Sequence, residues 1–151
     1  MIKDISQVDE ELEKFRIKVE ATTEEILKDI LSEGAKSIAL NSPVVTGHYI
    51  NNHEITLGSI GKGGKPAVKK TKKIVSPGGA KTRMLSKFIS IIEGITRKNK
   101  IISISNAVPY AINVEVLGWG KKPAYAVYQK AMSALQAEAV KQKAGFNAKE
   151  Y

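Results

Sequence analysis

The two histidines, His48 and His53, are the side chains with the widest chemical scope at neutral pH, because imidazole acts both as a general base and as a metal ligand. They are five positions apart on a segment expected to be a strand, so they should point to opposite faces and not share a metal ion. Neither stands beside a nucleophile-elbow serine, so no Ser-His-Asp set can be assembled. We therefore expect both to be polar residues at the surface or at a sheet edge, and we predict no catalytic residue, metal site or cofactor.

A single carboxylate, Glu115, stands between two turn segments and is the remaining candidate for acid-base chemistry. It has no acid-base partner at a recognisable spacing, and a lone carboxylate is more often structural. We predict that Glu115 accepts hydrogen bonds where the chain turns towards Gly118. The protein is accordingly predicted not to be an enzyme.

The main electrostatic feature is a run of nine cations without a carboxylate between Lys62 and Lys87. Lysines that neutralise phosphates release counterions and bind nucleic acid in a salt-dependent way, but this stretch lacks the aromatic residues that stack on bases. Three interpretations stay open: a solvated flexible arm, a contact with an acidic protein surface and, less favoured, a contact with DNA. The lysines expected to make the contact are Lys62, Lys65, Lys69, Lys70, Lys72 and Lys73.

Apolar residues recur at helical spacing through residues 1–40 and predict a long N-terminal helix. Ser6 with Asp9 predicts a capping box at its start, and the pair Thr22-Thr23 predicts a weak point that could divide it into two helices. A helix of this length would reach roughly 50 Å, which exceeds the width of a domain of this size. Part of it is therefore expected to touch another chain.

Residues 41–120 are predicted to form a small, mainly antiparallel sheet into which a flexible basic arm, residues 61–80, is inserted. Glycines and lysines at 61–65 lack the spacing of a phosphate-binding loop and indicate a mobile turn. The expected elements are strands at 48–60 and 101–105, a strand at 68–75 within the arm, a loop at 76–79 and a helix at 81–95.

The segment 121–145 is predicted to form a C-terminal helix, which Pro123 can start and Gly145 ends. A tail follows at 146–151. Its apolar stripe is expected to consist of Tyr125, Tyr128, Met132, Leu135 and Ala139. The predicted fold class is α+β, in one domain that covers residues 1–151.

Length and composition fit one domain that depends on packing or assembly, since the 151 residues include no cysteine. Residues 1–40 hold ten carboxylates and six cations, a net charge of −4. Since the whole chain has a net charge of +9, residues 41–151 carry +13. This asymmetry suits head-to-tail contact between copies as well as binding to a polyanion. No apolar run reaches the roughly 18–20 residues of a membrane span, and the acidic N-terminus lacks the apolar centre of a signal peptide. We expect a protein made in a cytoplasm and no membrane partner.

Two short motifs stand about sixty residues apart: Pro43-Val44-Val45-Thr46-Gly47, and Asn106-Ala107-Val108-Pro109-Tyr110-Ala111 followed by Glu115 and Gly118. The first is similar to a Pro-Val-Asp-Thr-Gly element, with Val45 in place of the aspartate. The second resembles a signature with an Asn, a Pro-Tyr-Ala, a Glu and a Gly in that order. In both respects, over roughly residues 25–135, the chain resembles the neck and tail-completion proteins of long-tailed phages, a family that includes minor tail protein Z-like tail components.

The resemblance implies a structural protein of the virion neck, assembled in the cytoplasm of a bacterial host. Copies would form a ring, with a hexamer as the first expectation and a dodecamer as the second, that completes the tail and joins it to the head. The implied partners are the head connector or head-closure protein, the tail tube or tail terminator protein, and DNA in the channel. The alternative from the residues alone is a non-specific nucleic-acid-binding protein that uses the stretch from Lys62 to Lys87.

Overall fold

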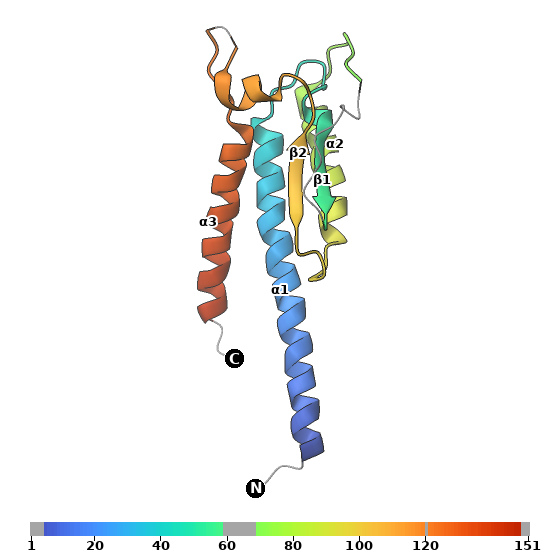
Figure 1. Cartoon of the computed structure of the whole chain (residues 1–151), viewed down its shortest axis with the longest axis vertical. Helices are drawn as coiled ribbons and strands as arrows, with labels where there is room; N and C mark the ends of the chain where they lie inside the picture. Colours follow the sequence, from blue (N-terminus) through green and yellow to red (C-terminus); the bar gives the residue numbers. More distant parts are fainter. Residues whose placement is uncertain (1–4, 59–68, 120, 149–151) are drawn as a thin grey trace.

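The computed structural model describes residues 5–58, 69–119 and 121–148. Over this part of the chain the order is helix α1, a short 3-10 helix η1, strand β1, helix α2, strand β2, a π-helical turn η2 and helix α3. Figure 1 shows an elongated molecule in which α1 extends well beyond the other elements at its N-terminal end. The predicted mobile turn with Lys62 and Lys65, and the end of the predicted tail, lie outside the described residues.

Helix α1 spans Ile5–Asn41 as one element of 37 residues, which corresponds to about 55 Å. The predicted division into two helices is wrong, because Thr22 and Thr23 lie within one unbroken helix. Their hydroxyls donate to carbonyl oxygens four residues earlier, at 2.9 and 2.8 Å. The predicted capping box is also wrong, since Ser6 lies inside the helix. Every side chain of residues 7–18 is exposed, and we call this projecting segment the stalk.

Helix α2 spans Pro77–Glu93 and begins earlier than predicted. Ser76 caps it, accepting from the Gly79 N–H at 3.4 Å, and Pro77 occupies the first turn, where it needs no hydrogen-bond donor. The predicted loop at 76–79 is therefore the cap and first turn of a helix. Residues 69–76 form no strand, although the Val75 N–H donates to the Val45 carbonyl at 2.9 Å.

The sheet consists of two antiparallel strands, β1 (His53–Leu57) and β2 (Ile102–Asn106), in a register that pairs His53 with Asn106 and Leu57 with Ile102. The first strand is much shorter than the predicted 48–60, because the chain forms the helix η1, Ile50–Asn52, immediately before it. The antiparallel pairing itself is confirmed.

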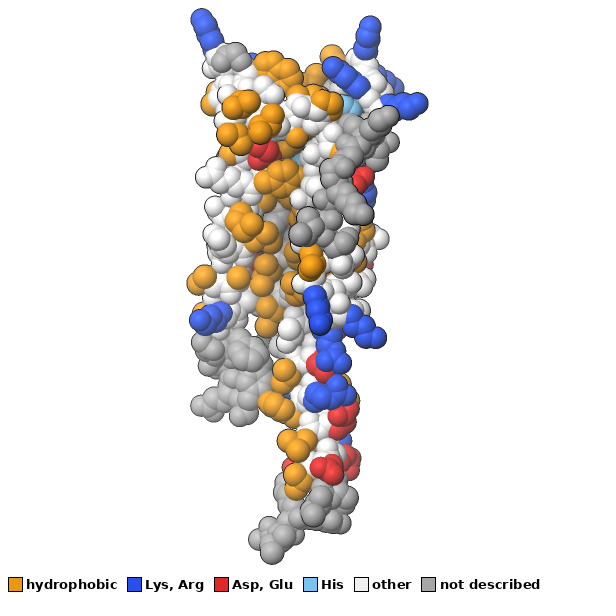
Figure 2. Space-filling view, viewed as in Figure 1, with side chains coloured by type: hydrophobic (Ala, Val, Ile, Leu, Met, Phe, Trp, Pro, Cys, Tyr) orange, Lys and Arg blue, Asp and Glu red, His pale blue; other side chains and the backbone are white. Residues whose placement is uncertain are grey.

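The hydrophobic core lies where the C-terminal half of α1 packs against α2 on one side and α3 on the other. The sheet contributes Ile102 and Ile104, as predicted, together with Ile55. The buried centre includes Leu31, Ala35, Ile38, Met84, Phe88 and Ile92. Apolar side chains also remain visible on the surface along the stalk and at the opposite end of the molecule (Figure 2).

Helix α3 spans Val127–Ala148, so it begins after the predicted Pro123 and continues through Gly145. It lies alongside α1, and Gln142 donates to Asp29 at 3.3 Å. The predicted apolar stripe is partly wrong, because Met132 is 55% exposed while Val127 and Ala131 are buried. The predicted class, α+β with long N-terminal and C-terminal helices and a small antiparallel sheet, is confirmed.

Candidate functional site

A cleft of about 350 Å³ lies between the loop that follows α1 and the segment from Tyr110 to Tyr125. This end of the molecule is opposite the stalk (Figure 1). The volume is in the range of pockets that receive a small ligand or a few large side chains. Its lining is largely apolar and aromatic, with two cations, and includes Pro43, Tyr110, Trp119, Tyr125, Lys70 and Lys122.

Two glycines fix the backbone of the cleft. Gly118 has φ +72°, and a Cβ there would lie 2.4 Å from the Lys122 carbonyl oxygen. This close approach allows Trp119 and Lys122 to exchange two backbone hydrogen bonds, each of 2.9 Å. Gly47 has φ +79°, with a hypothetical Cβ 2.9 Å from Asn51 Nδ2. Both glycines stand in the motifs of the sequence, and both are needed because side chains rarely adopt this backbone conformation.

Tyr110 and Trp119 form an aromatic wall of the cleft, with ring centroids 5.6 Å apart and planes inclined by 53°. The Tyr110 hydroxyl lies 3.0 Å from His48 Nδ1, and partial burial of the phenol raises the pKa of Tyr110. Trp119, in contrast, is 60% exposed. The wall therefore has an inner ring that is held by a hydrogen bond and an outer ring that is largely exposed to solvent.

Adjacent to the cleft is a buried polar network centred on His53, which is only 1% exposed. His53 Nε2 lies 2.9 Å from Ser42 Oγ, and Nδ1 lies 2.7 Å from the Tyr128 hydroxyl. Since Ser42 donates its proton to the Ile38 carbonyl at 2.6 Å, its oxygen must accept from His53. We therefore assign the ring proton to Nε2, which leaves Nδ1 to accept from Tyr128.

Burial, reinforced by the positive charge of Lys87, lowers the pKa of His53 to about 3. Lys87 also donates to the His53 carbonyl oxygen at 3.4 Å. The imidazole is thus neutral over the physiological pH range and joins the ends of α1, β1 and α3 as one donor and one acceptor. The predicted surface position of the histidines is wrong, because His48 too is buried. His53 does begin β1, an edge strand of the two-stranded sheet.

The Ser42–His53 pair resembles part of a hydrolytic triad, which sequence alone did not assemble. Three observations argue for a structural role instead. Ser42 is only 2% exposed, its proton is engaged by a main-chain carbonyl, and the other imidazole nitrogen meets the phenol of Tyr128 where a triad has a carboxylate. None of these three side chains lines the cleft. We infer that the pair holds secondary-structure ends together.

Glu115 lies in η2 (Asn113–Leu117) and accepts two hydrogen bonds, as predicted. One comes from the Tyr49 hydroxyl at 2.7 Å and the other from the Tyr128 backbone N–H at 2.9 Å, in the first turn of α3. A carboxylate is favourable at a helix N-terminus because it meets unpaired N–H groups and the positive end of the helix dipole. Burial and the bond to Glu115 raise the pKa of Tyr49.

The structure brings some of the predicted motif residues into the cleft and places the others beside it. Asn106 joins the buried network, where its Nδ2 donates to the Tyr49 carbonyl at 2.8 Å. Pro109 is exposed, and Ala111 packs against the core. The motif residues that line the cleft are Pro43, Val45, Thr46, Gly47, Tyr110 and Gly118.

The lysines of the predicted arm do not act as one unit in the structure. Lys70 lines the cleft, whereas Lys69, Lys72 and Lys73 are exposed on an irregular segment. The described part of the arm therefore contacts the cleft through Lys70, and this connects two features that the sequence presented separately. Lys62 and Lys65 lie outside the described residues.

Sequence reasoning missed Trp119, Tyr125 and Lys122 as cleft residues, and His53 with Tyr128 as the centre of the network. The sole tryptophan of the chain, placed beside Gly118 in the second motif region, was an available signal for the cleft. No comparable signal exists for His53 and Tyr128, which are 75 positions apart.

Within the described part of the chain, no group of three metal-ligating side chains is found. In that same part, no helix combines the length and apolarity needed to span a bilayer. Comparisons with protein-family models, curated proteins and solved structures yield no match to this chain. The cleft, the buried network and the stalk are therefore the features from which function is inferred.

Proposed function

We propose that the chain is a structural subunit of a tailed-phage neck. Copies form a ring, a hexamer in the first expectation and a dodecamer in the second, that completes the tail and joins it to the head connector. The two sequence motifs support the assignment to this class. The single observation that carries the structural proposal is the stalk, which lies outside the fold of its own chain.

The stalk carries an apolar stripe that no other described element covers. Val8, Leu12 and Phe15 recur at helical spacing and are between 40% and 60% exposed. A helical end without tertiary packing has little stability of its own, and clustered exposed apolar side chains mark interaction sites. A subunit that assembles with its neighbours accounts for both.

The total surface supports the same conclusion. The accessible surface is 10571 Å², whereas a compact monomer of 16.4 kDa would expose about 7,500 Å². The excess comes with the elongated shape seen in Figure 1. A protein of this kind gains burial by association rather than by folding alone.

The fold also brings residues of the two motifs together. Although they are about sixty positions apart, residues of both line one cleft, and each supplies a positive-φ glycine to it, Gly47 and Gly118. This is the arrangement expected of paired family signatures that define a shared surface. It supports the resemblance without naming the neighbours above and below the ring.

The ring is tested by electron microscopy of the purified full-length chain in negative stain, with its mass measured by light scattering over a wide concentration range. We expect closed rings with a central channel and a mass equal to six subunits, or to twelve. A monomer at every concentration, or filaments that never close, would overturn the ring proposal.

Non-specific binding to nucleic acid is a second candidate, favoured by the four exposed lysines at 69, 70, 72 and 73. Among the described residues, none of the four forms an ion pair. A salt titration of duplex DNA binding tests it, because several lysine–phosphate contacts lose affinity by orders of magnitude between low and physiological salt. Absence of binding at low salt would rule this candidate out.

Neutralising the arm separates attachment from folding. Changing Lys69, Lys70, Lys72 and Lys73 to Gln should alter the free energy of unfolding by no more than about 0.5 kcal/mol, since exposed side chains contribute little, while retention on head or tail particles falls. The matched control changes four exposed lysines elsewhere, Lys98, Lys100, Lys130 and Lys143, to Gln. Unfolding of the arm variant alone would show that its lysines belong to the folded core.

A further inference from the structure

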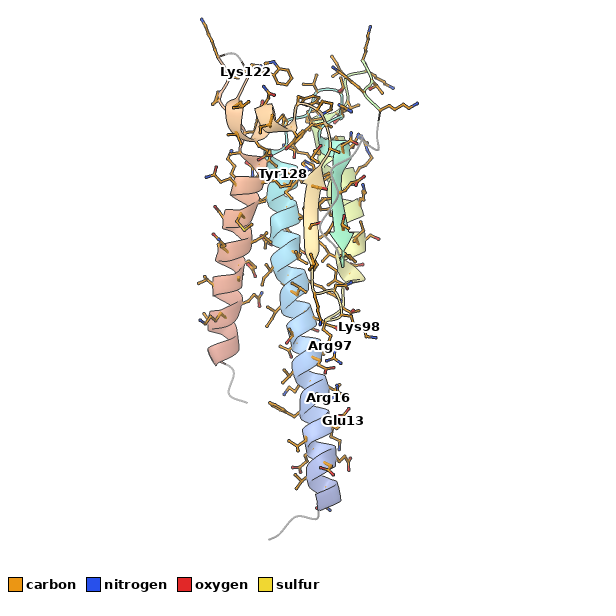
Figure 3. All side chains as sticks on the ribbon, in the orientation of Figure 1. Glu13, Arg16, Arg97, Lys98, Lys122 and Tyr128 are labelled. Atoms are coloured by element: carbon orange, nitrogen blue, oxygen red, sulfur yellow. The ribbon has the colours of Figure 1, made fainter. Side chains whose placement is uncertain are left out.

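Two groups of exposed apolar side chains lie at opposite ends of the described part of the chain. In Figure 3, Lys122 marks the cleft end, and Glu13 with Arg16 marks the stalk. At the cleft, Val45 is 65%, Trp119 60% and Tyr125 43% exposed, and all three line the same cavity. Large apolar side chains gathered around a concavity are expected where another protein docks.

The charge of the cleft indicates which kind of partner it fits. Lys70 and Lys122 line it, no carboxylate does, and Lys121 is exposed next to it. A partner should therefore bring apolar side chains to meet the aromatic wall and carboxylates to meet the lysines.

The stalk has this combination. Its first part, residues 7–13, contains four carboxylates and no cation. Leu12 is 60% and Phe15 53% exposed, and the two lie one turn apart on the same face. Two of the tip carboxylates also form ion pairs within the helix, Glu10 with Lys14 and Glu13 with Arg16. Residues 7–18 together carry four carboxylates and three cations, so the negative charge is confined to the tip of the stalk.

We propose that the stalk of one copy docks in the cleft of the next copy. Leu12 and Phe15 enter the cleft against Tyr110 and Trp119, while the carboxylates of the stalk tip face the cleft lysines. This is helix-in-groove recognition, in which a few side chains at helical spacing serve as anchors. The cleft volume of about 350 Å³ fits two anchors rather than a whole helix. The inference rests on the proposed function only in requiring that copies associate.

Two other occupants are less compatible with the structure. The stalk cannot reach the cleft of its own chain, because α1 is one continuous helix and the two surfaces lie at its opposite ends. Parallel stalk-to-stalk pairing would bring the carboxylates of two tips together, where like charges repel, and stalk pairing in either orientation would leave Trp119 exposed. Docking on a second copy covers both apolar surfaces and opposes unlike charges.

The contact is heterologous, since each copy uses one surface to bind and another to be bound. Such contacts generate a closed ring when the rotation between copies closes, and an open filament when it does not. The inference can therefore hold even if the ring proposal fails, and it can fail while the rings are real.

A mixing experiment with two broken variants tests the docking. The stalk variant is Leu12→Asp/Phe15→Asp, and the cleft variant is Val45→Glu/Lys122→Glu. All four side chains are exposed, so folding is checked by the cooperative urea transition of each variant. The matched control, Met132→Asp/Val140→Asp, makes the same type of change on the exposed face of α3.

Each broken variant alone should associate at least about 30-fold more weakly than the wild type, the loss typical of a disrupted hot spot, whereas the control should assemble normally. Mixed in equal amounts, the two variants should form a dimer with one copy of each, because one intact stalk meets one intact cleft. Light scattering and native mass spectrometry detect it. Absence of this mixed dimer overturns the docking, and if wild-type rings are still seen, the proposed function stands. If the mixed dimer forms but the wild type assembles into filaments, the docking is supported and the ring proposal is overturned.

Discussion

The buried network around His53 and the stalk of α1 follow opposite rules. In the network, polar side chains are withdrawn from water and paired with one another, and among the described residues no buried side-chain polar atom lacks a hydrogen-bond partner. In the stalk, apolar side chains are exposed to water, and no other described element covers them. Folding of one chain supplies hydrogen-bond partners to the polar groups of the network, but it leaves the apolar side chains of the stalk exposed.

The two regions should therefore contribute to different properties of the protein. A buried polar group that loses its partner costs the full desolvation of the group left behind, so the network should control the free energy of unfolding. An exposed apolar side chain contributes almost nothing to folding but can contribute much to association. Substitutions in the two regions should therefore separate stability from assembly.

The largest effect is expected from His53→Ala, which leaves a cavity and removes the partner of the Tyr128 hydroxyl. The free energy of unfolding should fall by about 3–4 kcal/mol, measured by urea denaturation at neutral pH. Phe15→Ala is the matched control from the stalk and should cost less than about 0.5 kcal/mol. Equal losses for the two variants would erase the contrast between the regions.

A smaller loss is expected from Glu115→Ala, which leaves the Tyr49 hydroxyl and the Tyr128 N–H without their acceptor. We expect about 2–3 kcal/mol from the buried hydroxyl and the lost helix cap. Glu115→Gln keeps one acceptor oxygen and should cost about half as much. If the two substitutions are equally harmless in urea denaturation, Glu115 does not hold the start of α3.

The free energy of unfolding should depend on pH because the pKa of His53 differs between the folded and unfolded chains. Its pKa is about 3 in the folded chain and about 6.5 when unfolded, so the unfolded state takes up a proton first as the pH falls. The stabilising contribution is complete above pH 6.5 and declines below it, by about 1.4 kcal/mol per pH unit. Urea denaturation between pH 6.5 and 5 measures the slope.

His53→Gln serves as the control, because it cannot titrate and retains hydrogen-bonding groups. Its slope over the same interval should be shallower than that of the wild type by the contribution of one proton. Parallel slopes for the two proteins would show that the imidazole is accessible to protons in the folded chain.

The smallest effect on folding is expected from Leu12→Gln/Phe15→Gln in the stalk. Both side chains are exposed and glutamine is a good helix former, so the free energy of unfolding of the dilute protein should change by less than about 0.5 kcal/mol. Light scattering at high concentration should nevertheless show reduced association. A loss of more than about 1 kcal/mol in the dilute protein would mean that the stalk packs on its own chain.

Much of the secondary structure was readable because it depends on neighbours along the chain. Helical spacing marked α1, Pro109-Tyr110 and Gly118 marked the turns, and the alternation of Ile102 and Ile104 marked β2. Boundaries were less predictable. Ser76 and Pro77 were interpreted as a loop although they cap α2, because the same residues favour a turn and a helix start.

Several features follow from the sequence alone: the fold class, the acidic segment 1–40 beside a basic remainder, the hydrogen-bonding role of Glu115, and an N-terminal helix that is longer than its own domain is wide. Three features became visible only in the folded chain: His48 and His53 are buried, the two motifs and Lys70 share one cleft, and Trp119 is exposed. The physical reason is the separation along the chain of the residues that interact. Helix and turn preferences act over a few residues, whereas the contact between His53 and Tyr128 spans 75 positions and exists only once α1, the sheet and α3 have packed together.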